Sequence, residues 1–455
     1  MHISLSDHFS AGRLLKFTLP SISTMIFTSI YSVVDGFFVS NFVGKTPFAA
    51  INLIMPVLII LGTVGFMFGT GGTALVAKTL GEGDKERANR YFSLLVYTAI
   101  GVGCALAAVS FIIIRPAARF LGAEGELLTH CVTYTRINLA SLPFFMLQVM
   151  FQTFFVAAER PKLGLTVTVF SGLTNMVLDG VLVLSLPQPY KLVGAAVATA
   201  LAQVVGGTVP LFYFFRKNPT LLRLGKTGFD GQALARACAN GASEFMSSIS
   251  MSVVGMLYNF QLMNYAGENG LAAYGVMMYV GMIFSAVFIG FSVGGAPVIS
   301  YHYGAENRQE LGSLLRKSLW IIALFGVSMV TAAELLARPL SRLFVSYDKA
   351  LFELTASGFR IYGLSFGFMG FGIIASSFFT ALNDGLTSAL ISFLRTMVFQ
   401  SASILVLPGL LGVNGIWISV VAAEAMSVVL GGFFLVQKRK KYGYSFRNCP
   451  KSRDA

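Results

Sequence analysis

Residues 49–75 read AAINLIMPVLIILGTVGFMFGTGGTAL, a stretch of apolar and small residues without one acidic or basic side chain. A bilayer core about 30 Å thick is crossed by roughly 20 apolar residues in a helix, so this stretch is long enough to span a membrane. None of the apolar stretches has the alternating pattern of outer-membrane barrel strands. Twelve apolar stretches long enough to span the membrane as helices occur, at approximately 14–39, 49–75, 92–114, 130–156, 164–186, 193–215, 238–263, 273–299, 317–338, 355–380, 387–409 and 415–437.

The composition supports the same conclusion. Of the 455 residues 55% are hydrophobic and 12% are charged, whereas soluble domains carry about 25% charged residues. The net charge of +13 comes mainly from the C-terminal tail and from every second segment between the spans, so most basic residues lie on one side of the membrane. This bias indicates a multi-pass protein of the cell membrane with both termini in the cytoplasm, and not a nucleic-acid-binding protein.

The chain also contains an internal duplication. At an offset of 223 residues, drifting to 224, five features align in order, which is typical of transporters. We therefore predict an all-α integral membrane protein of two six-helix halves related by a pseudo-two-fold axis along the membrane normal. The predicted boundaries are an N-terminal lobe at 1–215, a cytoplasmic linker at 216–236, a C-terminal lobe at 237–437 and a basic cytoplasmic tail at 438–455. The aligned features are Asn41–Gly44 with Asn264–Gly267, Phe68–Gly72 with Phe291–Gly295, Gly81 with Gly304, Arg115-Pro116 with Arg338-Pro339, and Arg136 with Arg360.

Four polar side chains are predicted to lie at a similar depth in the first half. Asp35 falls in the outer part of the first span, Asn175 and Asp179 in the fifth and Thr199 in the sixth. An ionisable group in hydrocarbon is costly, so each is a functional candidate. Two carboxylates, an amide and a hydroxyl would suit Na⁺, and the carboxylates could equally share a proton. The alternative is that these groups cap a helix or hydrogen-bond neighbouring helices.

Other intramembrane residues carry weaker signals. Glu244, in the seventh span, is a candidate for a substrate cavity or a salt bridge near the rim. Arg395 and Glu424 favour a structural pair with each other. Pro20 interrupts the first helix and is a candidate for a bend or a static kink. The four scattered cysteines indicate neither disulfides nor a metal site, so we expect no cofactor beyond the coupling Na⁺ or H⁺.

These residues together resemble the multidrug and toxic compound extrusion (MATE) family over nearly the whole chain. The resemblance rests on Pro20, Tyr31 and Asp35 followed by Asn41–Gly44, on the loops Leu80–Asp84 and Tyr303–Asn307, on Asn175 with Asp179, and on Gly194–Thr199. It implies export of cationic or amphipathic drugs and dyes, driven by entry of Na⁺ or H⁺. It also implies that Tyr31, Asp35, Asn175, Asp179 and Thr199 serve cation or proton coupling. The tenth span departs from some branches of the family because it contains no Asp or Glu.

Two other functions were weighed. A lipid-linked oligosaccharide or polysaccharide flippase of similar architecture would line its cavity with cations, whereas the buried candidates in the first half are acidic. An enzyme would need a catalytic constellation, but the four histidines are isolated and neither GxSxG nor HExxH occurs. The expected partners are therefore small cationic or amphipathic molecules and membrane lipid, and we expect a monomer.

Overall fold

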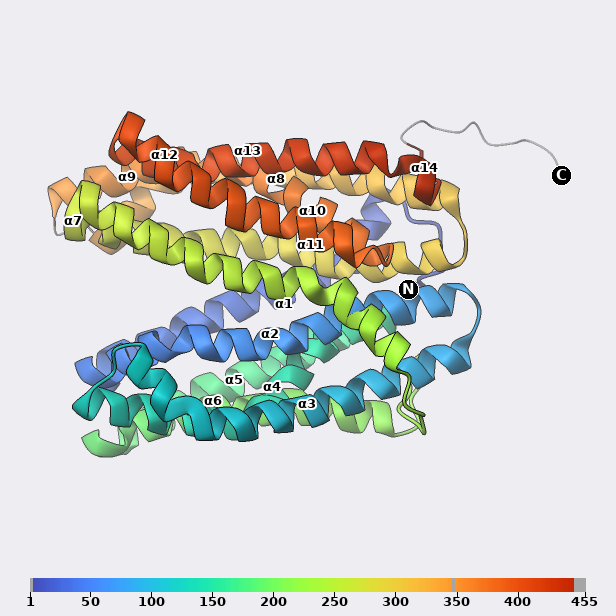
Figure 1. The fold of residues 1–455 in the computed structure, drawn as a ribbon, viewed down its shortest axis with the longest axis horizontal. Helices are drawn as coiled ribbons and strands as arrows, with labels where there is room; N and C mark the ends of the chain where they lie inside the picture. Colours follow the sequence, from blue (N-terminus) through green and yellow to red (C-terminus); the bar gives the residue numbers. More distant parts are fainter. Residues whose placement is uncertain (1–2, 346–347, 446–455) are drawn as a thin grey trace. The chain divides into compact units, whose positions relative to one another are not determined.

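The computed structural model describes residues 3–345 and 348–445, and all regular structure in these ranges is helical (Figure 1). The chain forms two compact units. Unit 1 comprises Met1–Ile22, Ala77–Gly83 and Ala242–Ala455, and unit 2 comprises Ser23–Val76 and Asp84–Gly241. The α-helices are α1 (Ala11–Phe38), α2 (Lys45–Gly81), α3 (Lys85–Phe120), α4 (Gly125–Ala157), α5 (Pro161–Ser185), α6 (Lys191–Phe215), α7 (Gly231–Gly304), α8 (Arg308–Val345), α9 (Lys349–Gly363), α10 (Phe366–Ala381), α11 (Gly385–Phe393), α12 (Ser401–Leu411), α13 (Val413–Gln437) and α14 (Arg439–Tyr442).

The described helices account for the twelve predicted spans. Ten helical segments are long and apolar enough to cross a membrane, and α9 with α10 forms a further span bent by 44°. The 74-residue α7 is interrupted at Gly267, where φ is 59°, so it supplies two spans. Gly44, which separates the π-helical segment Val39–Val43 from α2, also has positive φ. Because the repeat aligns Gly44 with Gly267, the same break occurs in both halves, and a backbone with positive φ favours glycine.

The tight turns between helices also share a backbone conformation. In four helix connections, the residue two positions before the start of the next helix has positive φ. These residues are Gly83, Glu159, Glu306 and Asn383. In two of the turns an acidic side chain then caps the helix: Asp84 accepts from the Arg87 backbone N–H at 2.9 Å and Asp384 from Thr387 at 3.3 Å. Such caps satisfy helix N–H groups that otherwise lack partners. Helices therefore begin several residues before the apolar spans.

In unit 2, α4 is the most enclosed helix, with 78% of its apolar window buried, and α3, α5 and α6 run beside it (Figure 1). Side-chain hydrogen bonds connect these helices. The Ser141 hydroxyl donates to Gln203 Oε1 at 2.7 Å, and the Ser171 hydroxyl donates to the Ala202 carbonyl at 2.7 Å. Interhelical hydrogen bonds of this kind contribute about 0.6 kcal/mol each in a membrane. They fix the register of α4, α5 and α6.

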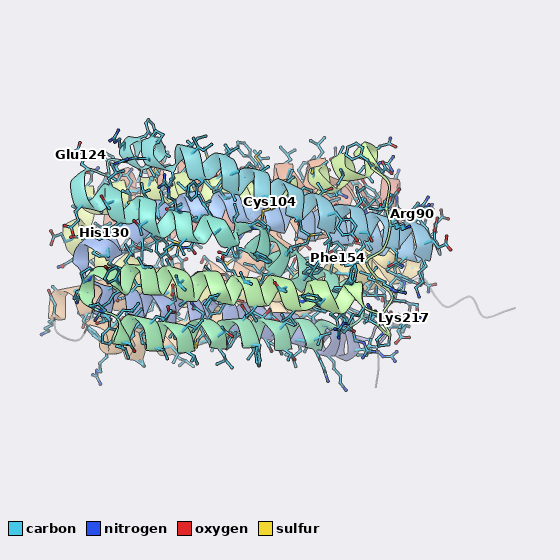
Figure 2. The ribbon with its side chains drawn as sticks, turned by 90° about the horizontal axis from the view of Figure 1, so that it is seen from below. Arg90, Cys104, Glu124, His130, Phe154 and Lys217 are labelled. Atoms are coloured by element: carbon cyan, nitrogen blue, oxygen red, sulfur yellow. The ribbon has the colours of Figure 1, made fainter. Side chains whose placement is uncertain are left out.

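The two ends of unit 2 carry different side chains. Figure 2 shows Arg90 and Lys217 toward one end and Glu124 and His130 at the other. Arg90 belongs to α3 and Lys217 follows α6, so basic residues from two separate connections meet at the same end. This is the arrangement that the charge pattern of the sequence requires.

In unit 1 the N-terminal segment is held against α8. Glu310, which is only 5% exposed, accepts from the Phe9 backbone N–H at 3.0 Å and lies 2.6 Å from His8 Nδ1. Lys317 in turn donates to the Phe9 carbonyl. At the other terminus, residues 438–445 are ordered, and the rest of the predicted basic tail, 446–455, lies outside the described residues. The lobe boundaries predicted at 215 and 237 stay a prediction.

Candidate functional site

The five predicted coupling residues all lie in unit 2. Tyr31 and Asp35 are four residues apart on α1, and Asn175 and Asp179 are four apart on α5, so each pair lies on one helix face. Thr199 lies on α6. The close approach of α1 to α5 depends on Gly172, since a Cβ there would lie 3.1 Å from Tyr31 Cδ1.

The two carboxylates lie together in the interior. Asp35 lies close to both Asp179 and Asn175, and Tyr31 lies close to Asp35. The Asp179 side chain is completely buried and Asn175 is 3% exposed. Three of the five residues thus form one cluster of oxygen and amide atoms between α1 and α5, and two acidic groups meet at its centre.

Several atoms of this cluster lack hydrogen-bond partners. Both carboxylate oxygens of Asp179, one of Asp35 and both side-chain amide atoms of Asn175 are buried without a partner among the described residues. An unsatisfied buried polar atom costs about 1–3 kcal/mol, and more when it is charged. Carboxylate and amide oxygens are chemically suited to a hard cation, and carboxylates to a proton.

Sequence reasoning missed two residues of α4. Tyr134, which is 2% exposed, lies close to both carboxylates and interacts with Thr199 and Asn138. The Asn138 amide donates to the Tyr134 carbonyl at 3.0 Å. The feature of the sequence that could have indicated them is a Tyr and an Asn four residues apart in an apolar span. Through Tyr134, α4 joins α6 to the carboxylate cluster.

Apolar side chains enclose one side of the cluster. Tyr134 belongs to a buried group that contains Val39 of the π-helical segment, Val183 of α5, and Ala195 and Ala196 of α6. The Thr199 hydroxyl donates to the Ala195 carbonyl at 3.1 Å. Its oxygen therefore keeps acceptor capacity. Because these surroundings are apolar, electrostatic interactions within the cluster are stronger than they would be in water.

Glu244 and Pro20 do not belong to this cluster, because both lie in unit 1. Glu244 is half-buried on α7 and forms no ion pair with a described residue. Pro20 is buried, and α1 continues as one α-helix from Ala11 to Phe38 across it. The proposed bend and cavity roles stay predictions.

The structural pairing of Arg395 with Glu424 is confirmed. Arg395 Nε lies 2.9 Å from Glu424 Oε2 and Nη2 lies 2.8 Å from Oε1, which is a bidentate arrangement. Glu424 is completely buried on α13, and Arg395 lies in a π-helical segment, Leu394–Gln400. Each charge neutralises the other.

Comparison with known proteins is consistent with this geometry. The sequence profile of the MatE family matches residues 20–181 and 245–403, well over half of the chain. The multidrug export protein MepA of Staphylococcus haemolyticus is 24% identical over 94% of this chain and 94% of its own length. MepA of Staphylococcus aureus strain MRSA252 is 23% identical over 91% of this chain and 90% of its own.

Solved structures share the fold. A MATE crystal structure in the straight conformation has a TM-score of 0.89 at 21% identity, covering 96% of this chain and 98% of that one. An outward-facing multidrug resistance MATE family transporter also has a TM-score of 0.89 at 21% identity, with coverages of 96% and 97%. At this level of identity the likeness concerns the fold.

Proposed function

The chain belongs to the MatE family, and from that premise we propose that it is an antiporter that exports cationic or amphipathic drugs and dyes, driven by Na⁺ or H⁺. The relatives named as multidrug export proteins cover nearly the whole chain, which supports export of small molecules. The proposed setting is the cell membrane, with both termini in the cytoplasm and the protein acting as a monomer.

One observation carries the coupling proposal: Asp179 is completely buried with both carboxylate oxygens unpartnered, close to Asp35. Two negative charges in a buried site repel each other, and a cation or proton bound between them removes the repulsion. Asp35, Asp179, Asn175 and the Thr199 oxygen would hold Na⁺, or the carboxylates alone would hold a proton. The fit is chemical, because these are hard oxygen ligands.

Coupling then follows from the free-energy difference between the loaded and empty sites. An empty pair of carboxylates favours a conformation in which water or ions reach it, whereas a neutralised pair tolerates burial. An ion that binds the two conformations with different affinity shifts the equilibrium between them. Tyr134 and Tyr31 transmit the change, since both lie beside the carboxylates and each belongs to a different helix.

We favour efflux over the flippase alternative because of the second half of the chain. A flippase for a lipid-linked pyrophosphate needs buried cations available for the phosphates. The half-buried guanidinium of Arg395 is instead bound by Glu424 through two parallel contacts. The acidic cluster of unit 2 favours cationic cargo.

The proposal is tested with purified protein in proteoliposomes on which Na⁺ and pH gradients are imposed separately. Dye efflux by wild type should follow one of the two gradients. Asp179→Asn keeps the shape and one oxygen but removes the charge and the titratable proton, so gradient-driven efflux should fall at least tenfold while dye binding persists.

The matched control is Asp230→Asn, because Asp230 is a half-buried carboxylate that caps the start of α7, accepting from the Gln232 N–H at 3.1 Å and the Ala233 N–H at 2.9 Å. Asn is an equally good cap, so this variant should transport like wild type. Full gradient-driven efflux by Asp179→Asn at matched protein level would contradict the coupling site. Absence of efflux of any dye by wild type, together with a defect in envelope glycan export on deletion, would instead favour the flippase.

A further inference from the structure

A polar pocket lies in unit 1. Its volume is about 270 Å³, and it opens where the ends of α2 and α7, the start of α8 and the short α14 meet. Its charged lining residues are Lys78, Glu82, Glu306, Arg308 and Lys441. Cavities that enclose drug-sized ligands run from about 300 to 1,000 Å³, so this pocket suits a smaller group.

The close meeting of α2 with α7 depends on two glycines. A Cβ at Gly81 would lie 2.0 Å from the Tyr301 carbonyl oxygen, and a Cβ at Gly304 would lie 2.0 Å from the Lys78 carbonyl oxygen. The two contacts are equivalent, because the repeat offset of 223 residues aligns Gly81 with Gly304 and Lys78 with Tyr301. The backbones meet here at a distance that only glycine allows, and the pocket walls are therefore built on a rigid base.

His302 forms part of the wall of this pocket. The residue is 3% exposed, and its Nε2 is enclosed without a hydrogen-bond partner among the described residues. The exposed charged side chains of the lining are therefore the groups that a ligand in the pocket can reach.

The charged lining comprises three cations, Lys78, Arg308 and Lys441, and two carboxylates, Glu82 and Glu306, which leaves a formal excess of one positive charge. Lys78 Nζ lies 3.6 Å from Glu82 Oε1, so the positive charge of Lys78 is already paired within the pocket. Neither Arg308 nor Lys441 forms an ion pair with a described carboxylate. A guanidinium and an ammonium that face one small pocket are the groups that proteins use for phosphate oxygens.

The C-terminal segment forms one wall. Asp384 Oδ2 accepts from Lys438 Nζ at 2.7 Å and from the Tyr442 hydroxyl at 2.6 Å. Tyr442 itself lines the pocket, next to Lys441. The cation on Lys441 is therefore positioned by a helix that is tied to α11 through Asp384, and not by a loose tail.

We propose that this pocket binds an anion of phosphate chemistry, held by Arg308 and Lys441. The anion is either the headgroup of an anionic phospholipid or a free phosphate. Occupancy of this site would fix α14 against α8.

The test uses the full-length protein in detergent, with inorganic phosphate titrated against chloride at constant ionic strength and binding measured by calorimetry. Saturable binding is expected, and it should weaken at least tenfold in Arg308→Gln and in Lys441→Gln. Both residues are exposed, so neither change removes core packing. The matched control is Lys440→Gln, an exposed neighbour on the same helix that does not line the pocket; it should stay within twofold.

A second arm separates the two sources. In nanodiscs of phosphatidylcholine alone or with phosphatidylglycerol, loss of phosphate binding in the presence of phosphatidylglycerol would support a lipid headgroup. Equal phosphate binding in both nanodiscs would support a soluble anion. Absence of saturable binding in both arms would overturn the proposal, and so would a Lys440→Gln effect as large as that of Lys441→Gln.

Discussion

The Asp384 contacts should hold the C-terminal segment by a measurable free energy. Burial acts to raise the pKa of the Asp384 carboxyl, but hydrogen bonds from Lys438, Tyr442 and Thr387 outweigh it and lower the pKa from 3.8 to about 2. Its side chain is 9% exposed, so solvent screens the interaction little. A shift of this size corresponds to about 2 kcal/mol.

The sign of the pH dependence follows from that shift. Because the folded-state pKa lies below the unfolded one, the stabilisation is fully present above about pH 4 and is lost as the pH falls through about 2. At pH 7 Asp384→Asn should therefore remove it, while the amide still caps α11. An opening equilibrium that changes by about 2 kcal/mol changes by about 30-fold.

Hydrogen exchange of the amides in residues 439–445 measures this opening. Protection should fall about 30-fold in Asp384→Asn at pH 7, and trypsin should cut faster after Lys438. Asp348→Asn is the control, because Asp348 caps α9 through the Ala350 and Leu351 N–H groups without contacting this segment. Unchanged protection in Asp384→Asn, or an equal loss in Asp348→Asn, would refute the reasoning.

Three further outcomes are expected. Gly304→Ala places a methyl group inside contact distance of a backbone oxygen and should destabilise the protein by about 1–3 kcal/mol, whereas Gly295→Ala meets no atom within 4 Å and should leave the melting temperature unchanged. Glu424→Gln leaves the half-buried Arg395 guanidinium without its charged partner and should cost up to about 3 kcal/mol, seen as a lower melting temperature; a neutral result would contradict a structural role for the pair. A reporter fused after Arg453 should be active only in the cytoplasm, and periplasmic activity would overturn the proposed orientation.

The helices were predictable because the signal for a membrane span is local. Twelve apolar stretches correspond to the twelve spans of the described helices, including the break at Gly267 that the repeat aligns with Gly44. What the apolar pattern could not predict is the irregularity inside spans. The 44° bend between α9 and α10 and the π-helical segment around Arg395 depend on packing against neighbouring helices.

The site was predictable only in part. A carboxylate in an apolar span is conspicuous, so Asp35 and Asp179 could be singled out, with Asn175 one turn away from the latter. Tyr134 could not, because a tyrosine in an apolar helix usually lies at an interface or in the core. Its place beside the carboxylates follows from how α4 packs against α5 and α6.

The sequence by itself therefore determined the membrane class, the span positions and the duplication, because hydropathy and spacing act along the chain and need no knowledge of contacts. The tertiary structure decided which helices are neighbours, and so which polar atoms meet and which stay unsatisfied. The orphaned oxygens of Asp179 and the bidentate Arg395–Glu424 pair are facts of that kind. The same holds for the pocket that His302 lines, whose walls come from three segments far apart in the sequence. Hydrogen bonds and charge interactions act over a few ångströms in space, and only the folded chain sets those distances.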